Sequence, residues 1–301
     1  MDGPMKAGIG IAIGISLVAV GGISLLAYKI LFAKKQPVTL KDPNVKVPLL
    51  LIDAYDLTHD TVYFIFKLPS PDHLLGIQTG QHVYLSARIN GELVVRPYTP
   101  ISSVKTRGQV EFVIKVYRPN DKFPEGGKMS QYLASLTPGV STIDFRGPSG
   151  KIIYKGNGKF TIMRKKPFEF TVSKISLIAG GTGITPMFQM IEQILKDEND
   201  MTTIKLLFAN NSEKDILMRD QLDQLAKSHS DQFSVWYTIT NAENHWKYSR
   251  GFITPEMISN NIFPATEDNV VFLCGPPPMI DYACLPALDK LKYRKEMIFC
   301  F

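Results

Sequence analysis

A glycine-rich turn stands between an apolar segment and a predicted helix. Gly180, Gly181 and Gly183 allow positive φ and close backbone approach. Thr185 is expected as the helix N-cap, and Pro186 suits the first helical position. Such a turn directs free N–H groups and the positive end of a helix dipole at one point, which favours an anion; in an α/β sheet that anion is usually a nucleotide pyrophosphate. Taken alone, the turn is equally compatible with a tight connection that binds nothing.

A second apolar segment, residues 270–273, stops abruptly at Cys274 and is followed by three prolines at 276–278. Because proline continues neither a strand ladder nor a helix interior, we expect an extended chain beyond the strand. This leaves the small, polarizable side chain of Cys274 at the carboxyl edge of the sheet, where ligands of open α/β sheets bind.

Four motifs follow one another along the chain: RPYTP at 96–100, GGKMSQYL at 126–133, GGTGITP at 180–186 and CGPPPM at 274–279. Their order and spacing, together with RGPSG at 146–150 and a terminal Phe301, resemble the ferredoxin-NADP reductase superfamily of flavoproteins. Within it, the sequence is similar to the NADH–cytochrome b5 reductase family over residues 38–301.

The resemblance implies an FAD site. A planar guanidinium suits a phosphate, so Arg96 is expected on the FAD phosphates, with Tyr98 against the isoalloxazine and Thr99 near its N5. By themselves these residues are more typical of an edge strand that ends at a proline turn. The implied FAD contacts are Arg96, Pro97, Tyr98, Thr99, Val113, Lys115, Gly127, Lys128, Met129, Ser130 and Thr185. Arg118 and a shortened loop 118–123 depart from the family pattern and leave the adenine-side contacts open.

The resemblance also implies an NADH site, formed by Gly180, Gly181, Thr182, Gly183, Thr240, Cys274, Gly275, Pro276 and Met279. Thr99 and Cys274 are the candidate catalytic residues. Since flavin accepts the hydride itself, Cys274 is expected to position the ligand rather than to react. The alternative is that Cys274 is only a small buried residue of the strand. Phe301 either covers the flavin or pyridine site or belongs to a docked terminal strand.

Cofactor choice is expected to depend on the end of the strand at 233–240. NAD-selective sites usually place an acidic side chain on the adenosine ribose, where it repels a 2′-phosphate. The family usually has Asp at this position, whereas this chain has Thr240. We therefore predict that NADPH is tolerated beside NADH, unless Asn241 or Glu243 supplies the discrimination instead.

The activity that the resemblance implies is hydride transfer from NADH to FAD, followed by single-electron transfer to a haem protein similar to cytochrome b5. The alternatives are a reductase of quinones or other small acceptors, and a membrane scaffold without electron transfer. The basic run Arg164-Lys165-Lys166 is compatible with steering an acidic haem partner and equally with a solvated loop.

Composition excludes several classes of protein. A formal net charge of +6 over 301 residues is a modest excess, and its dispersed Lys and Arg residues match no nucleic-acid motif. Three cysteines with no C-x-x-C spacing argue for reduced thiols rather than a metal site or a disulfide framework. The five histidines form no metal pattern, and no hydrolase motif is present.

The amino-terminal segment 7–28 contains no charged residue, and its side chains up to Tyr28 are apolar, small or hydroxyl-bearing. Its length predicts a transmembrane helix, and the lysines at 29, 34 and 35 predict that the following domain lies in the cytosol. A cleaved secretory peptide and a buried soluble helix are the alternatives. Asp2 excludes an N-myristoyl signal. The resemblance implies the endoplasmic reticulum, the mitochondrial outer membrane or both.

The predicted fold class is α+β with two domains behind this anchor. Regular short strands predict a small antiparallel FAD-binding β-barrel, whereas alternating strands and helices predict a Rossmann-like parallel sheet that binds NAD. The expected organisation is anchor 1–35, linker 36–48, barrel 49–155, connection 156–172 and nucleotide domain 173–301. Expected barrel elements are strands at 61–68, 82–89, 92–98, 109–117 and 141–146, a hairpin turn at Asn90-Gly91, and a helix at 128–135. Expected nucleotide-domain elements are strands at 173–179, 203–209, 233–240, 270–274 and 296–301, and helices at 186–196, 214–228, 254–260 and 279–290.

Overall fold

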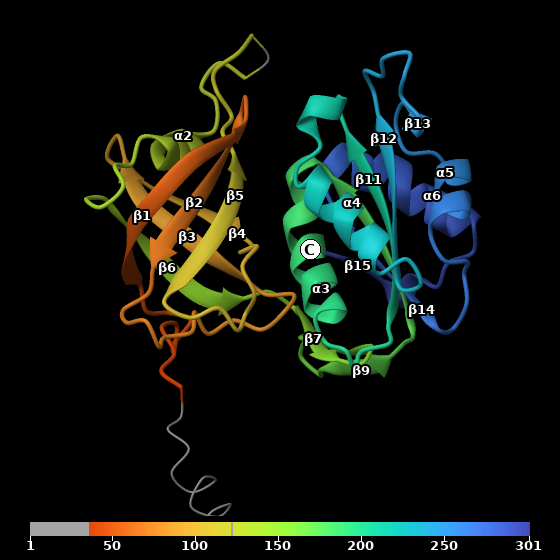
Figure 1. The fold of residues 1–301 in the computed structure, drawn as a ribbon, viewed down its shortest axis with the longest axis horizontal. Helices are drawn as coiled ribbons and strands as arrows, with labels where there is room; N and C mark the ends of the chain where they lie inside the picture. The colour runs from red at the N-terminus through yellow and green to blue at the C-terminus, as the bar shows by residue number, and fades with distance from the viewer. Residues whose placement is uncertain (1–35, 122) are drawn as a thin grey trace, which may run out of the picture. The chain divides into compact units, whose positions relative to one another are not determined.

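The computed structural model describes residues 36–121 and 123–301 (Figure 1). The predicted anchor at 7–28 lies outside these residues. Within the described part of the chain, no helix is both long enough and apolar enough to span a bilayer. Residues 38–301 form one unit, and this unit contains both predicted domains.

The first lobe is a six-stranded antiparallel sheet with the order β4-β3-β6-β1-β2-β5. Its strands are β1 (Val47–Thr58), β2 (Thr61–Lys67), β3 (His82–Ile89), β4 (Glu92–Tyr98), β5 (Gln109–Lys115) and β6 (Thr142–Ser149), and helix α2 spans Lys128–Ala134. The expected antiparallel strands are therefore present. The barrel is not closed by hydrogen bonds, because β4 and β5 are the two end strands of the ladder.

Local sequence explains this sheet. Phe64 and Phe66 alternate with less buried residues along β2 and pack with Phe112 and Phe145 in a core from which water is excluded. The β3–β4 hairpin turns at Asn90 and Gly91, whose φ values of 51° and 82° are those of the predicted tight turn.

The predicted connection at 156–172 contains strands. β7 (Ile152–Gly156), β8 (Lys159–Ile162) and β9 (Phe168–Thr171) form a small antiparallel sheet of their own. Buried Asp200 binds this sheet to the second lobe by accepting hydrogen bonds from the Tyr154 hydroxyl and, at 2.9 Å, from the Asn157 N–H. The segment is thus an ordered part of the fold rather than a loop.

The second lobe is a six-stranded sheet with the order β13-β12-β11-β10-β14-β15, and every pairing in it is parallel. Its strands are β10 (Lys174–Gly180), β11 (Thr203–Asn210), β12 (Phe233–Ile239), β13 (Ser249–Arg250), β14 (Asn269–Cys274) and β15 (Ile298–Cys300). Strand order reverses at β10, so the crevice beside β10 and β14 is the switch point at which such sheets bind ligands.

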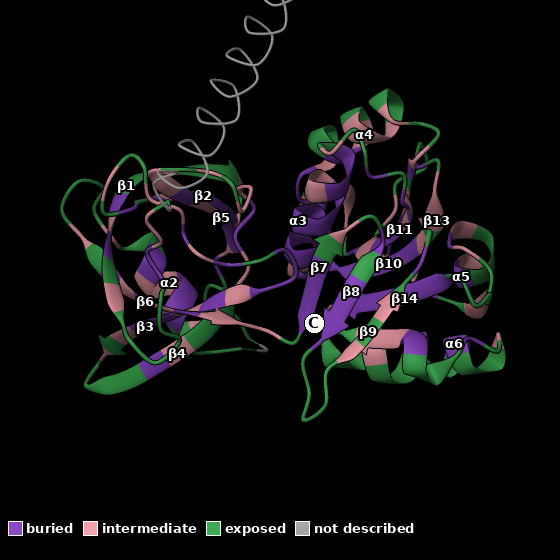
Figure 2. Ribbon diagram, turned by 90° about the horizontal axis from the view of Figure 1, so that it is seen from below, coloured by how far each residue is buried: buried purple, intermediate pink, exposed green. Residues whose placement is uncertain are grey.

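Helices cover both faces of this sheet, as predicted for a Rossmann-like domain (Figure 2). They are α3 (Ile184–Leu195), α4 (Arg219–Ser228), α5 (Pro255–Asn261) and α6 (Leu285–Lys290). Leu177 and Phe208 face the core that contains α3, whereas Ile178 and Leu207 face α5 and α6. The predicted helix at 214–228 is shorter than expected: residues 213–215 form a separate turn, η2 (Glu213–Asp215), and Met218 with φ 57° interrupts the chain before α4.

A single buried amide on α3 connects the two lobes. Gln189 Oε1 accepts a hydrogen bond of 2.7 Å from the Gly80 N–H, and Gln189 Nε2 donates to the carbonyls of Gln81 and Pro100 at 3.5 and 3.4 Å. Gln189 is 3% exposed, so water cannot take over the hydrogen bonds that it forms with these backbone groups.

Gln189→Leu is therefore expected to lower the free energy of unfolding by about 1–3 kcal/mol, because it leaves the buried Gly80 N–H unpaired. Chemical denaturation of the described unit measures this loss. Gln193→Leu is the matched control, since Gln193 lies one turn further along α3 and its side chain forms no hydrogen bond in the described structure. Equal effects of the two substitutions would contradict the assigned role of Gln189.

Candidate functional site

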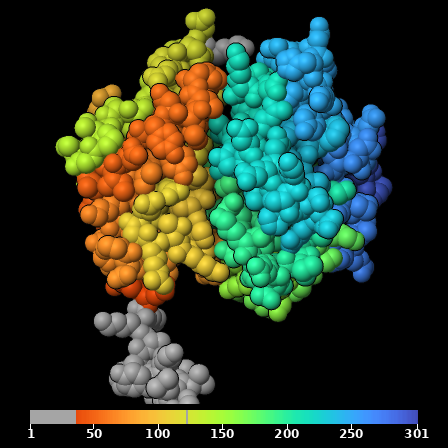
Figure 3. Space-filling view, in the orientation of Figure 1, coloured from red at the N-terminus to blue at the C-terminus, as the bar shows by residue number. Residues whose placement is uncertain are grey.

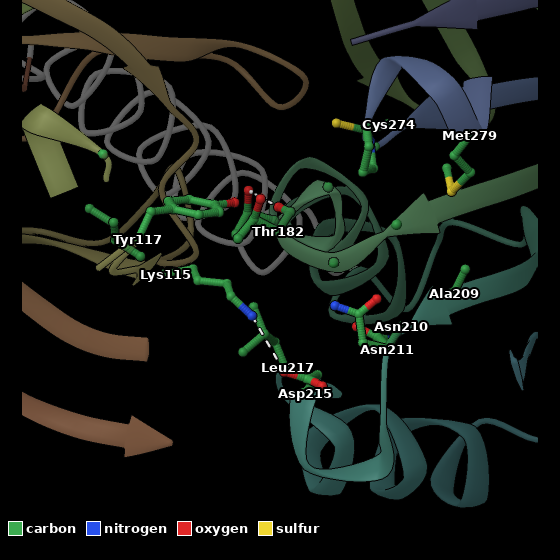
Figure 4. A pocket seen from close by; sticks show the side chains of 18 of the residues that line it. Lys115, Tyr117, Thr182, Ala209, Asn210, Asn211, Asp215, Leu217, Cys274 and Met279 are labelled. Carbon is green, nitrogen blue, oxygen red and sulfur yellow. Dashed lines mark hydrogen bonds and ion pairs between the residues drawn. The ribbon is translucent and has the colours of Figure 1, made fainter. Parts of the chain in front are cut away.

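The two lobes lie side by side in the space-filling view (Figure 3). A cleft of about 1370 Å³ is lined by residues from both of them (Figure 4). Every residue predicted for the two cofactor sites lines this cleft. From the first lobe these are Arg96, Pro97, Tyr98, Thr99, Val113, Lys115, Gly127, Lys128, Met129 and Ser130; from the second they are Gly180, Gly181, Thr182, Gly183, Thr185, Thr240, Cys274, Gly275, Pro276 and Met279. The structure therefore brings the four sequence motifs to one place.

The glycine turn after β10 is shaped by two different constraints. Gly181 has φ 52°, and a Cβ there would meet nothing within 4 Å. Gly183 and Gly180 are glycines for another reason: a Cβ would clash with the carbonyl group of Cys274 at the first position and with the Met279 side chain at the second. The turns after β10 and β14 thus pack directly against each other.

The predicted N-cap role of Thr185 is wrong. Helix α3 begins at Ile184 with Gly183 as its N-cap, and no side chain caps it. Thr185 lies inside the first turn and donates its hydroxyl to the Thr182 carbonyl at 3.2 Å. The Ile184 N–H donates to the Gly181 and Thr182 carbonyls, so α3 continues directly from the glycine turn. The turn therefore lies at the positive end of the helix dipole, which favours an anion.

The prediction of an extended chain after β14 is also wrong. Pro278 is helical, with φ −60° and ψ −34°, and η3 (Met279–Cys284) follows immediately as a π-helical turn that continues into α6. The first turn of a helix leaves its N–H groups unpaired in any case, so prolines are tolerated there. This turn directs Met279 and Tyr282 to the cleft.

The first-lobe wall of the cleft is rich in cationic groups. The exposed Arg96 guanidinium donates to the Val95 carbonyl at 2.8 Å and is paired with no carboxylate among the described residues. Lys128 lies at the start of α2 and contacts Glu92 at 3.1 Å. The Ser130 hydroxyl accepts from the Tyr117 N–H at 3.2 Å and donates to the Gly127 carbonyl at 3.0 Å, which fixes the loop before α2.

Lys115 occupies the floor of the cleft between two carboxylates, at 2.7 Å from Asp60 and 3.4 Å from Asp215 (Figure 4). Burial acts against its charge, but hydrogen bonding and attraction to Asp60, with Asp215, outweigh burial and raise the pKa of Lys115. His59, Asp60 and Asp215 lie close enough to bind a metal ion, which the sequence did not indicate. The Lys115 ammonium already supplies the cation of this cluster.

Cys274 is a neutral thiol at physiological pH. Burial, and secondarily Cys300, raise the pKa of Cys274 to about 12. Phe301 continues the chain past β15, its N–H bonds to the Leu273 carbonyl at 3.0 Å, and it lines the cleft. The expected docked terminal strand is therefore present as β15, and Phe301 follows it at the edge of the cleft.

Several lining residues were not predicted, among them His82, Tyr117, Asn210, Asn211, Phe252 and Tyr282. Asn210 is 9% exposed, and neither its amide nitrogen nor its amide oxygen has a hydrogen-bond partner in the described structure. His82 Nε2 is likewise unpartnered, and burial lowers the pKa of this histidine. The signal that indicates the asparagines is their place directly after an apolar strand, at the carboxyl edge of the sheet.

The residues present fit FAD and a pyridine dinucleotide. Buried polar atoms are normally hydrogen-bonded, so the unpartnered atoms of Asn210 and His82 indicate a polar ligand in this cleft. Unpaired Arg96 suits a phosphate, and the uncapped start of α3 suits a second one.

Comparisons with known proteins agree with this geometry. Residues 48–154 match the family model of the oxidoreductase FAD-binding domain, and residues 177–285 match that of the oxidoreductase NAD-binding domain. NADH-cytochrome b5 reductase 3 of Rattus norvegicus is 51% identical, over 90% of this chain and 92% of the relative. NADH-cytochrome b5 reductase 2 of Xenopus laevis is 53% identical, over 89% of this chain and 92% of the relative.

The fold has a solved counterpart as well. The cytochrome b5 reductase domain of Ulva prolifera nitrate reductase superposes with a TM-score of 0.83 at 39% identity, covering 88% of this chain and 100% of that domain. Sequence, domain order and fold therefore lead to one assignment: the chain belongs to the NADH-cytochrome b5 reductase family of FAD- and NAD-binding oxidoreductases.

Proposed function

We propose that the chain is an NADH-dependent flavoenzyme that reduces cytochrome b5. The observation that carries the proposal is the single cleft in which the motif residues of both lobes face each other. When bound, FAD accepts a hydride from NADH and passes electrons on singly to a haem acceptor. The protein's task is to hold the two reacting rings in a near-attack arrangement.

In this proposal, cationic side chains bind the phosphates and neutral side chains contact the flavin ring. Arg96 and Lys128 bind the FAD phosphates, Tyr98 offers its ring to the flavin, and the Thr99 hydroxyl hydrogen-bonds the flavin edge. Tyr98 is a neutral phenol, because burial raises its pKa. The glycine turn and the start of α3 bind the dinucleotide pyrophosphate.

Cys274 is a positioning residue in this scheme. With a pKa of about 12 it neither donates nor accepts a proton near neutral pH. Its small side chain and the adjacent Gly275 leave room for the nicotinamide ring beside the glycine turn.

The acceptor and the membrane association complete the proposal. Cytochrome b5 is the acceptor named for the relatives, and we assign it to this chain. Lys165 and Lys166 are exposed in the turn between β8 and β9 and are available to an acidic partner, whereas Arg164 stacks on Phe168 at 4.5 Å. Segment 7–28 anchors the protein, with its catalytic part in the cytosol, on the endoplasmic reticulum or the mitochondrial outer membrane.

Anaerobic titration of the purified protein tests the central claim. NADH should bleach a yellow flavin spectrum, and oxidised cytochrome b5 should restore it while the haem is reduced. Restoration by a quinone but not by cytochrome b5 would favour a small-acceptor reductase, and a colourless protein would leave only a scaffold.

Arg96→Ala should weaken FAD retention, since a charge-assisted contact of about 1.5–3 kcal/mol is lost. The ratio of flavin to protein absorbance after purification measures the effect. Arg88→Ala is the control, because Arg88 is on the neighbouring strand β3 and does not line the cleft. A full flavin complement in the Arg96 variant would remove this residue from the site.

Removal of residues 1–35 should give a protein that keeps its flavin and its NADH oxidation but no longer sediments with lipid vesicles. The reason is that both lobes lie within residues 38–301. Flavin loss on truncation would contradict the separation of anchor and catalytic unit; vesicle binding by the truncated chain would contradict the anchor.

Cys274→Ser should slow flavin reduction less than Cys274→Phe, because size rather than ionisation matters at this position. Between pH of about 6 and about 9, a range that spans the ordinary cysteine pKa, the rate of flavin reduction should depend on pH in the same way in the wild type and in the serine variant. Stopped-flow bleaching of the flavin provides both measurements, and an inflection that depends on the thiol would contradict the positioning role.

A further inference from the structure

The part of the cleft beyond the glycine turn is formed by the carboxyl ends of β11 and β12. Asn210, Asn211 and Thr240 line it, with Gly251 and Phe252 from the segment after β13. Backbone and hydroxyl bonds connect the two strand ends: the Thr240 N–H donates to the Asn210 carbonyl at 3.2 Å, and Thr240 Oγ1 donates to the Asn211 carbonyl at 3.0 Å. If the proposed function holds, the pyrophosphate lies on the glycine turn and the adenosine half of the dinucleotide extends over these strand ends.

This subsite is built to hold a polar ligand. Asn210 is more than nine-tenths buried, and both atoms of its side-chain amide lack a partner in the described structure. Figure 4 shows it in the wall of the cleft beside Asn211. An unpaired buried amide costs free energy, and a ligand that offers both donors and acceptors removes that cost.

No free carboxylate lines this end of the cleft. The acidic lining residues are Glu125, which belongs to the first lobe, and Asp215, which is held by Lys115 and by Ser212. Neither Asn241 nor Glu243 lines the cleft; the Glu243 carboxylate is 78% exposed and contacts His245. The residue at the end of β12 that faces the ligand is therefore the neutral Thr240.

A cation stands next to this neutral edge. Arg250 pairs in register with Ile239, the residue before Thr240. Its guanidinium donates to the backbone carbonyls of Ala242, Glu243 and Asn244, at 3.5, 2.9 and 3.4 Å, and it forms no ion pair within the described chain. Its charge is consequently not cancelled by a carboxylate. Arg250 does not itself line the cleft, so its charge acts on a ligand there only at long range and is screened by salt.

We propose that this subsite accepts a 2′-phosphorylated adenosine, so that the protein binds NADPH as well as NADH. An acidic side chain at the end of β12 would bind the ribose hydroxyls and repel a 2′-phosphate, whereas Thr240 binds a hydroxyl and repels neither ligand. The proposal rests on the proposed function only in placing the dinucleotide in the cleft.

Calorimetric titration of the flavin-loaded protein with NAD⁺ and NADP⁺ tests it without turnover. We expect the two dissociation constants to agree within about tenfold, a ratio that corresponds to about 1.4 kcal/mol. Adenosine 2′,5′-bisphosphate should compete with NADH at least as well as 5′-AMP does. Binding of NADP⁺ should also weaken more steeply with added salt than binding of NAD⁺, because it carries the additional charge.

Two substitutions of Thr240 by residues of nearly equal size, one charged and one neutral, separate the effect of charge from the effect of shape. Thr240→Asp should raise the ratio of the NADP⁺ to the NAD⁺ dissociation constant by about tenfold or more, whereas the neutral Thr240→Asn should keep that ratio near the wild-type value. A wild-type protein that binds NAD⁺ but rejects NADP⁺ by a hundredfold or more, about 2.7 kcal/mol, would overturn the inference and leave the proposed function intact. Failure to bind either nucleotide would overturn both.

Discussion

The close approach of two turns, one after β10 and one after β14, is the contact on which the site depends. Both lie at the switch point of the parallel sheet, and their packing leaves no space for a Cβ at Gly183, where it would meet the Cys274 carbonyl; at Gly180 a Cβ would meet the flexible end of the Met279 side chain. Because these positions have no side chain, the start of α3 and the thiol of Cys274 reach the same cavity. A larger residue would push the two turns apart and separate the groups that must share one ligand.

The same constraint extends to the first lobe through α3. This helix begins at the glycine turn and, little more than one turn later, presents Gln189 to the backbone of residues 80, 81 and 100. At the floor of the cleft, Lys115 of β5 contacts Asp215 of the second lobe. A short, rigid path of hydrogen bonds therefore joins the nucleotide turn to the strands that carry the flavin residues, which favours a fixed ring-to-ring distance.

Much of this arrangement could be predicted from the sequence, and the misses have physical causes. Alternating apolar residues and the Asn90-Gly91 turn indicate the antiparallel sheet, since both signals are local. Threonine is a common N-cap, which favours Thr185 at that position, but here the glycine turn continues into the helix and the N-cap is Gly183, two residues earlier. The prolines at 276–278 favour an extended chain because the rule against proline holds for helix interiors, whereas Pro278 stands at the start of a helical turn, where proline is tolerated. The position of Asn210 at the end of an apolar strand can be found in the sequence, but its unpartnered amide, the unpartnered His82 nitrogen and the Lys115 cluster cannot, because they result from burial and from contacts between residues far apart in the chain.

Charge is distributed unevenly along the cleft, and this has a chemical consequence. Arg96, Lys115 and Lys128 bring cations to the first-lobe side, where a flavin dinucleotide requires compensation for its phosphates. Next to the glycine turn the groups are neutral: the thiol of Cys274 and the phenol of Tyr98 have raised pKa values, and Asn210, Asn211 and Thr240 carry no charge. At the adenosine end, the proposed tolerance of NADPH follows from the same neutrality, because the side chain at the end of β12 is Thr240 and carries no charge to repel a 2′-phosphate.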